Sequence, residues 1–175
     1  MIIIYPTETC YGLGCSAFDK EGIKKIYELK KRDSSKPLIL LVDSIKMWKQ
    51  IAKVSKKAEA LAKKHWPGAL TIIQPKKSCI PDLLAKEEIG VRLSPHRIPN
   101  KLIKELKAPI VSTSANIAGG KTPYSIGEIP ESIKKHADKI IDYGKLEFNP
   151  ASTVIKIEKN KVLLVRKGSI ENFEL

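Results

Sequence analysis

The run PLILLVD at residues 37–43 is the feature that most constrains the fold, because it is apolar without alternation. A continuous apolar run of this length is typical of a strand buried on both faces. Other runs rich in apolar and β-branched residues predict further strands, expected at 1–6, in 66–75, in 87–95, in 108–114 and near 139–142. The segment 152–166 contains two such runs separated by Lys159-Asn160, which predicts a hairpin.

Helices are predicted between these strands. Asp19 is placed to cap a helix that runs through Leu29, and Ser44 and Ser55 are placed to cap two more. The helix after Ser55 is expected to end near His65, and shorter helices are expected from Pro99 to about Leu106 and around 131–137. Helices joined by both crossovers and hairpins predict an α/β (α+β) fold with a mixed sheet and flanking helices. With no repeats or linker-like stretches, we expect one domain over residues 1–175.

Composition limits the classes of protein that fit. Hydrophobic residues make up 42% of the chain, enough for a packed core, yet no run approaches the ~20 apolar residues of a membrane span. The opening MIIIYPTE lacks the features of a signal peptide. The three cysteines are odd in number and lack zinc-type spacing, so we expect reduced thiols in a cytoplasmic protein with no membrane partner.

The formal net charge of +13 indicates a polyanionic partner, either nucleic acid or a phosphate-bearing small molecule. A lysine-coated solvent face explains the bulk of the charge equally well. The distribution of arginine is more informative. The chain uses lysine for nearly every positive charge but has arginine at four positions, 32, 92, 97 and 166. Arginine presents a rigid fork that matches carboxylate and phosphate, so these positions are the first candidates for a site.

Several segments are polar where structure alone does not demand it. The strand of APIVSTSANIAGGKTP (108–123) ends in three hydroxyls and a carboxamide, followed by a Gly pair and a lysine. PTETCYGLG (6–14) has hydroxyls at the end of a strand expected to be central, and its glycines suit either a tight turn or a close approach to a ligand. KKRDSSKP (30–37) joins a helix end to a strand, and IGVRLSP places Arg92 either on a solvent face or on a buried face with an anion.

Familiar catalytic motifs are absent from the sequence. There is no Walker A loop, GxGxxG or GxSxG pattern, and the three histidines form no HExxH or other metal pattern, so no metal site is predicted. What remains is a set of arginines, lysines and small hydroxyls without an evident covalent catalyst.

Taken in order, these segments resemble the YrdC family of threonylcarbamoyl-adenylate synthases. The matching residues are YPTETCYGLGCSA, LKKRDSSKPLILLV, WPGALTII, IGVRLSPH, VSTSANIAGGKTP and PASTV…VRKGSI, spread over almost the whole chain. The resemblance implies a twisted α/β domain with a basic cavity. It also implies that L-threonine, bicarbonate or CO2, and ATP with Mg2+ react to give threonylcarbamoyl-AMP and pyrophosphate. That product would supply the complex that makes N6-threonylcarbamoyladenosine in tRNA.

The resemblance also implies roles for single residues. Matched by position, the nucleotide-binding set is Lys30, Arg32, Lys36, Ser114, Asn116, Thr122 and Arg166. Lys30 and Arg32 are the predicted catalytic pair. The threonine-binding set is Thr7, Arg92, Ser112 and Ser152, with Arg92 as the expected partner of the amino-acid carboxylate. Such a cage suits the reaction, since attack of a carbamate oxygen on the α-phosphorus needs held anions and stabilised charge rather than a protein nucleophile.

The chain departs from the family pattern in places. Leu41 stands where some relatives carry histidine, and Lys36 stands where many carry asparagine. The start at MIIIYP lacks the usual lead-in, and the length corresponds to the short single-domain form. Two other functions stay open at this point. One is an RNA-binding module that grips tRNA or ribosomal RNA, or weak non-specific RNA binding besides catalysis; the other is a nucleotide-binding paralogue with altered carbamoyl chemistry.

Overall fold

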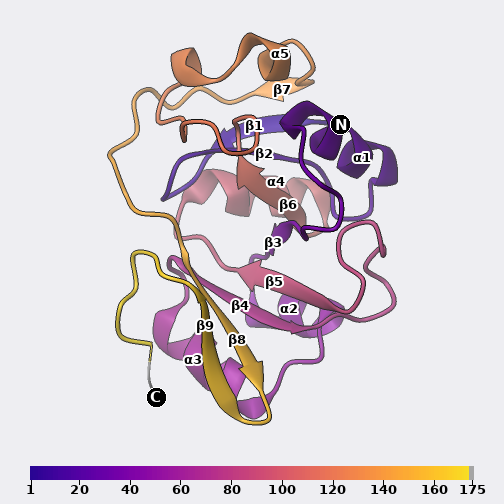
Figure 1. Ribbon diagram of the computed structural model, residues 1–175, viewed down its shortest axis with the longest axis vertical. Coiled ribbons are helices and arrows are strands. Elements are labelled where there is room, and N and C mark those ends of the chain that lie inside the picture. The colour runs from indigo at the N-terminus through magenta and orange to yellow at the C-terminus, as the bar shows by residue number, and fades with distance from the viewer. Residues whose placement is uncertain (174–175) are drawn as a thin grey trace.

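A computed structural model describes residues 1–173, and within them nine strands form one mixed sheet (Figure 1). The order across the sheet is β7-β1-β2-β6-β3-β5-β4-β8-β9. The strands are β1 (Ile3–Pro6), β2 (Tyr11–Gly14), β3 (Ile39–Leu41), β4 (Leu70–Pro75), β5 (Glu88–Arg92), β6 (Ile110–Ser114), β7 (Lys139–Ile140), β8 (Thr153–Glu158) and β9 (Lys161–Arg166). The prediction of an α/β fold with a mixed sheet is confirmed.

Strand β3 lies in the middle of the sheet, while β1 is only one place from the edge formed by β7. The expectation that the opening strand is central is therefore wrong. Three neighbouring pairs are parallel, namely β1 with β7, β3 with β5 and β4 with β8, and the others are antiparallel. A strand's place in a sheet depends on pairings between distant segments, which its own sequence does not reveal.

The helices begin where their caps predict. They are α1 (Lys20–Lys30), α2 (Ile45–Ile51), α3 (Lys56–His65), α4 (Arg97–Leu106) and α5 (Glu131–Lys134), with a 3₁₀ turn η1 at Ile126–Glu128. The side chains of Asp19, Ser44 and Ser55 accept hydrogen bonds from backbone N–H groups in the first turns of α1, α2 and α3. Helix α4 begins two residues before Pro99, because His96 caps it by accepting from the backbone N–H of Ile98. Helix α5 is shorter than expected.

Apolar side chains cover both faces of the sheet, and within the run at 37–43 the side chains of Leu38, Leu40, Leu41 and Val42 are buried, whereas Pro37 is exposed. Leu40 packs in the larger core cluster with Trp48 and Trp66, whose rings lie 4.7 Å apart. Leu41 points to the opposite face and packs with Tyr5 and the side chains of α4 in a smaller cluster. Both leucines are fully buried. The cost of burying the strand's backbone is met by pairing with β5 and β6.

Strand β2 excludes the tight turn, one of the two explanations that the sequence left open for its glycines. Gly12 and Gly14 lie within the strand, opposite Tyr5 and Ile3 of β1. A Cβ at Gly12 would lie 3.3 Å from the Tyr5 ring, and one at Gly14 would lie 2.0 Å from the carbonyl oxygen of Val111. Glycine is needed at position 14 because β6 approaches too closely for a side chain, not because the backbone turns, whereas the contact at Gly12 is merely tight.

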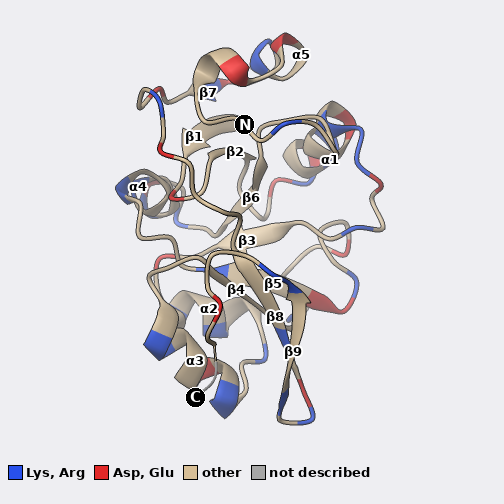
Figure 2. Cartoon of the chain, turned by 60° about the vertical axis from the view of Figure 1, so that its left-hand side comes forward, with Lys and Arg blue, Asp and Glu red and all other residues tan. Residues whose placement is uncertain are grey.

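The hairpin of β8 and β9 is confirmed. Lys159 and Asn160 form its turn with φ of 45° and 64°, values that suit the tight turns of two-residue hairpins. Lysine and arginine occur at both ends of the molecule, on the helices and on this hairpin, and acidic residues lie among them (Figure 2). Within residues 1–173, no helix combines the length and apolar character that crossing a membrane requires.

Candidate active site

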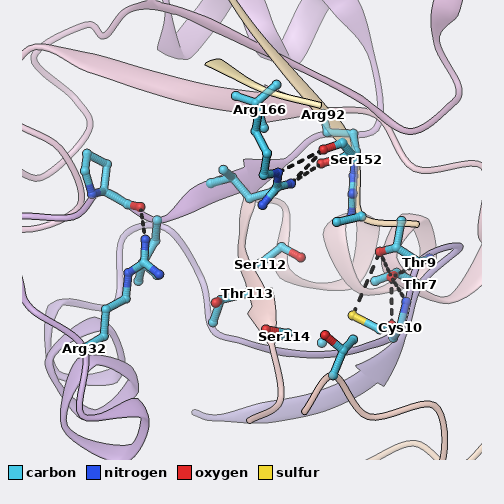
Figure 3. Close-up of a pocket in the computed structure, with 17 residues that line it drawn as sticks. Thr7, Thr9, Cys10, Arg32, Arg92, Ser112, Thr113, Ser114, Ser152 and Arg166 are labelled. Atoms are coloured by element: carbon cyan, nitrogen blue, oxygen red, sulfur yellow. Dashed lines mark hydrogen bonds between the residues drawn. The ribbon is translucent and has the colours of Figure 1, made fainter. Parts of the chain in front are cut away.

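A cavity of about 250 Å³ opens where several strands end and where the loops that follow them meet (Figure 3). Its walls come from the β1–β2 turn, the start of β3, the ends of β5 and β6, and the two ends of the β8–β9 hairpin. The lining residues of predicted function are Thr7, Arg32, Arg92, Ser112, Ser114, Thr122, Ser152 and Arg166. The fold thus brings together side chains that are up to 159 residues apart in the chain, from Thr7 to Arg166.

Three of the four arginines, at positions 32, 92 and 166, line this cavity. The fourth, Arg97, lies at the start of α4 with its guanidinium 5.5 Å from the centre of the Tyr143 ring. Burial lowers the pKa of Arg166, and the nearby positive charges of Arg92 and Arg32 lower it further. Positive charges held this close together repel one another, which favours an anionic ligand between them.

Arg92 lies on a buried face of β5, which resolves the two possibilities left by the sequence. Its side chain is 4% exposed, and its Nε lies 3.2 Å from Oε1 of Glu8. Neither of these two atoms has a hydrogen-bond partner among the described residues. The other carboxylate oxygen of Glu8 accepts a hydrogen bond of 2.5 Å from the Ser94 hydroxyl. Glu8 therefore faces Arg92 from behind the cavity wall.

Sequence reasoning missed Glu8. Its only signal was its place between the hydroxyls of Thr7 and Thr9 in an uncharged stretch.

Arg166 is bound to Ser152, as Figure 3 shows. Its Nε and one Nη donate to the carbonyl oxygen of Ser152 at 3.1 and 2.8 Å, and the same Nη lies 3.0 Å from the Ser152 hydroxyl. That hydroxyl also lies 2.9 Å from the Thr71 hydroxyl of β4. These contacts hold the end of β9 against the start of β8, so the guanidinium has a defined position at the cavity wall.

Thr7 organises the β1–β2 turn. Its hydroxyl donates to the carbonyl oxygen of Cys10 at 2.8 Å and accepts from the backbone N–H groups of Thr9 and Cys10 at 3.2 Å each. Burial raises the pKa of the Cys10 thiol, which also lines the cavity. The lining residues that were not assigned a role from the sequence include Thr9, Cys10 and Thr113.

Arg32 and Lys36 were predicted together but lie differently. The Arg32 guanidinium donates to the backbone carbonyls of Lys36 and Pro37 at 3.1 and 3.0 Å, and it lines the cavity. The Lys36 side chain is exposed and does not line it. Leu41 does not line it either, because its side chain lies in the core on the face covered by α4.

Lys30 lies behind the cavity wall rather than on it. Its side chain is 2% exposed, and Nζ donates to the carbonyl oxygens of Ser114 and Asn116 at 2.5 and 2.7 Å and to Asn116 Oδ1 at 3.1 Å. Asn116 Oδ1 also accepts from the Ser114 hydroxyl at 2.6 Å. Burial lowers the pKa of Lys30 to about 8, and the Arg32 charge contributes to the shift. Lys30 and Asn116 therefore hold the turn after β6 from outside the cavity.

The chemistry of the site is that of anion binding. The cavity offers guanidinium groups and hydroxyls, and within residues 1–173 no cluster of three or more His, Cys, Asp or Glu could hold a metal ion. The fold and site thus define an α/β protein with a cationic, hydroxyl-lined cavity at the strand ends, a lining that suits anionic small molecules. Residues 1–168 match the model of the Sua5/YciO/YrdC family, which carries the description "telomere recombination", and the chain belongs to this family.

Relatives in sequence span nearly the whole chain. A Methanocaldococcus jannaschii protein, named as a candidate threonylcarbamoyl-AMP synthase, is 39% identical over 97% of this chain and 80% of its own length. The threonylcarbamoyl-AMP synthases of Pyrococcus abyssi and Bacillus subtilis are 36% and 34% identical, each over 97% of this chain. The chain spans about half the length of these two relatives, 51% and 50%.

Solved structures agree with the fold. The crystal structure of Pyrococcus abyssi Sua5 complexed with L-threonine superposes with a TM-score of 0.90 at 36% identity, over 95% of this chain and 50% of that one. Escherichia coli YciO gives a TM-score of 0.85 at 28% identity, over 95% and 82%. The family resemblance inferred from the motifs is confirmed.

Proposed function

We propose that this protein is a threonylcarbamoyl-AMP synthase, a nucleotidyltransferase whose substrates are L-threonine, bicarbonate or CO2, and ATP. The observation that carries the proposal is the meeting of Arg32, Arg92 and Arg166 with small hydroxyls in one cavity. Support comes from the named synthases among its relatives and from the threonine complex of the Pyrococcus abyssi structure. We propose that it works in the cytoplasm and passes its product to a threonylcarbamoyl transferase complex acting on tRNA.

The reaction proceeds in two steps. The uncharged amine of threonine attacks CO2, a nitrogen–carbon bond forms, and the amine proton is released to give a carbamate. A carbamate oxygen then attacks the α-phosphorus of ATP, the bond from that phosphorus to the bridging oxygen breaks, and pyrophosphate departs. The second step brings two anions together, so the work of the protein is to hold the reactants in line and to stabilise the developing charge.

The cavity residues are assigned to the two substrates by where they lie. Arg92 of β5, which lines the same cavity as Thr7, Ser112 and Ser152, is proposed to bind the threonine carboxylate. Arg32, Arg166, Ser114 and Thr122 are proposed to bind the nucleotide phosphates and sugar. Lys30 and Asn116 act by holding the turn that carries Ser114. Lys36 would have to reorient to reach a phosphate.

Magnesium is proposed to arrive as part of the substrate. Among the described residues, the carboxylate beside the cavity is Glu8, which is already engaged by Arg92 and Ser94. Within residues 1–173 no cluster of three or more His, Cys, Asp or Glu could hold a metal ion, and MgATP is the form of nucleotide that we expect the protein to bind.

The test is pyrophosphate release from ATP, measured with threonine and bicarbonate each omitted in turn. We expect release only when all three substrates are present. ATP turnover that ignores threonine would contradict the synthase proposal and would favour a paralogue with altered chemistry. Detection of threonylcarbamoyl-AMP by mass spectrometry, with 13C-bicarbonate adding one mass unit to the product, separates the two directly.

A further inference from the structure

The cavity is small for a site that must bind both threonine and ATP. Its volume of about 250 Å³ lies below the ~300–1,000 Å³ of pockets that enclose a single drug-sized ligand. Threonine and the triphosphate must share this space if the proposed function holds. The nucleoside end of ATP must then extend out through the mouth, where it needs a surface of its own.

Two chain segments lead away from residues that line the cavity. Thr122 and Ala151 both line the cavity. From Thr122 the chain reaches Tyr124 after two residues, and from Ala151 it leads back to Phe148 after three. The backbone N–H of Leu146 donates to the carbonyl oxygen of Tyr124 at 2.7 Å, so the two segments are joined. Figure 1 shows the second segment as the irregular stretch that descends along one side of the molecule from β7 to β8.

These two segments carry an exposed aromatic pair. The ring centres of Tyr124 and Phe148 lie 5.5 Å apart at an interplanar angle of 48°. Phe148 is 76% exposed, the largest exposed fraction among the exposed large hydrophobic side chains of residues 1–173. Burial raises the pKa of Tyr124, which lies two residues along the chain from the cavity-lining Thr122. Exposed phenylalanine has an unfavourable contact with water and gains from a flat partner.

Other exposed apolar groups fit this role less well. Tyr143 already contacts His96 and Arg97. Leu163, Leu164 and Val165 on β9 are exposed but aliphatic, so they offer no ring for stacking. Phe18 lies at the start of α1, away from the residues that line the cavity.

We infer that Tyr124 and Phe148 form the platform on which the adenine base of ATP stacks. The inference rests on the proposed function and extends it, since it places the base outside the cavity and the phosphates inside, toward Arg32 and Arg166. Stacking of a base on an aromatic ring tolerates different bases, so we expect the platform to favour purines by area rather than to read hydrogen bonds.

The experiment uses calorimetric titration of the full chain with two ligands, ATP and inorganic tripolyphosphate. Phe148→Ala should weaken ATP binding by about five- to 150-fold, equivalent to about 1–3 kcal/mol, and leave tripolyphosphate binding within about twofold. Phe148→Trp should keep ATP affinity close to that of the parent. Phe18→Ala, which also removes a half-exposed ring, is the matched control and should behave like the parent.

The outcomes are distinguishable. Equal ATP affinity of Phe148→Ala and the parent would overturn the platform while leaving the synthase proposal intact. Equal loss of ATP and tripolyphosphate would also overturn it, because the residue would then act on the phosphate site or on the fold. A parent protein that binds no ATP would overturn both proposals. Loss confined to ATP, with unchanged KM for threonine, supports the platform.

Discussion

The Nε of Arg92 lies 3.2 Å from Oε1 of Glu8, and both atoms are buried without a hydrogen bond among the described residues. The two groups form an ion pair without a hydrogen bond between these atoms. Ser94 fixes the far side of the carboxylate. The guanidinium therefore keeps a counterion behind it while its remaining donors are available to a ligand in the cavity.

Replacing Arg92 by lysine should cripple the use of threonine. The charge is kept, but the fork that grips a carboxylate through two parallel hydrogen bonds is lost. Because a hydrogen bond to a charged group is worth about 1.5–3 kcal/mol, we expect kcat/KM for threonine to fall about ten- to a hundredfold or more. A threonine titration measures it. Arg97→Lys is the control, since Arg97 is exposed and lies over Tyr143. Near-parental kinetics of Arg92→Lys would mean that the threonine site lies elsewhere.

The charge state of Lys30 should depend on pH near neutrality. Its pKa is lowered by burial, and secondarily by Arg32, to about 8 from an ordinary value of 10.5. Between these values the unfolded chain binds the proton and the folded protein does not, so this residue's contribution to the free energy of unfolding should increase with pH from about 8 to about 10.5. We expect the 13Cε resonance of Lys30 to titrate near pH 8.

A matched comparison isolates this effect. The difference in free energy of unfolding between the parent and Lys30→Met should shift in favour of the parent by on the order of 1 kcal/mol between pH 7.5 and 9.5. A difference that is constant over this range, or a Lys30 resonance that titrates above pH 10, would show that burial does not perturb the group.

Gly14→Ala should destabilise the protein strongly. The added methyl would lie 2.0 Å from the carbonyl oxygen of Val111, a backbone atom that cannot yield without separating β2 from β6. We expect a loss of at least about 2 kcal/mol in urea unfolding. Gly127→Ala is the control, because its Cβ would meet nothing closer than 4.0 Å. A parental unfolding midpoint for Gly14→Ala would contradict the tight strand contact.

RNA binding, where it is measured, should be weak and independent of sequence. The positive charges of the protein are mostly lysines. They lie on elements at both ends of the molecule rather than around stacking aromatics (Figure 2). Counterion release then predicts a steep fall of affinity with salt concentration. Fluorescence anisotropy with two unrelated RNAs at 50 and 200 mM salt measures this. Tight binding to one RNA that persists at high salt would instead favour the RNA-binding module.

The elements could be predicted well from the sequence, and the site only in part. Helix starts at Asp19, Ser44 and Ser55 were predictable because each cap bonds a backbone group at most three residues away. The four arginines were the first candidates for a site because arginine is rare in a chain that otherwise uses lysine. Three of the four line the cavity. Glu8 was missed, since a single carboxylate in a polar turn has no pattern that distinguishes it.

The amino-acid sequence alone determined the alternation of strands and capped helices, the hairpin at Lys159-Asn160 and the cationic, hydroxyl-rich character of the site. These depend on the backbone preferences and side chains of near neighbours in the chain. The tertiary structure decided that β3 is the central strand, that Gly14 lies against Val111, and that Lys30 lies behind the cavity rather than in it. Those facts depend on which distant strands pair and on which groups water can reach, and both are set only when the whole sheet has closed around its core.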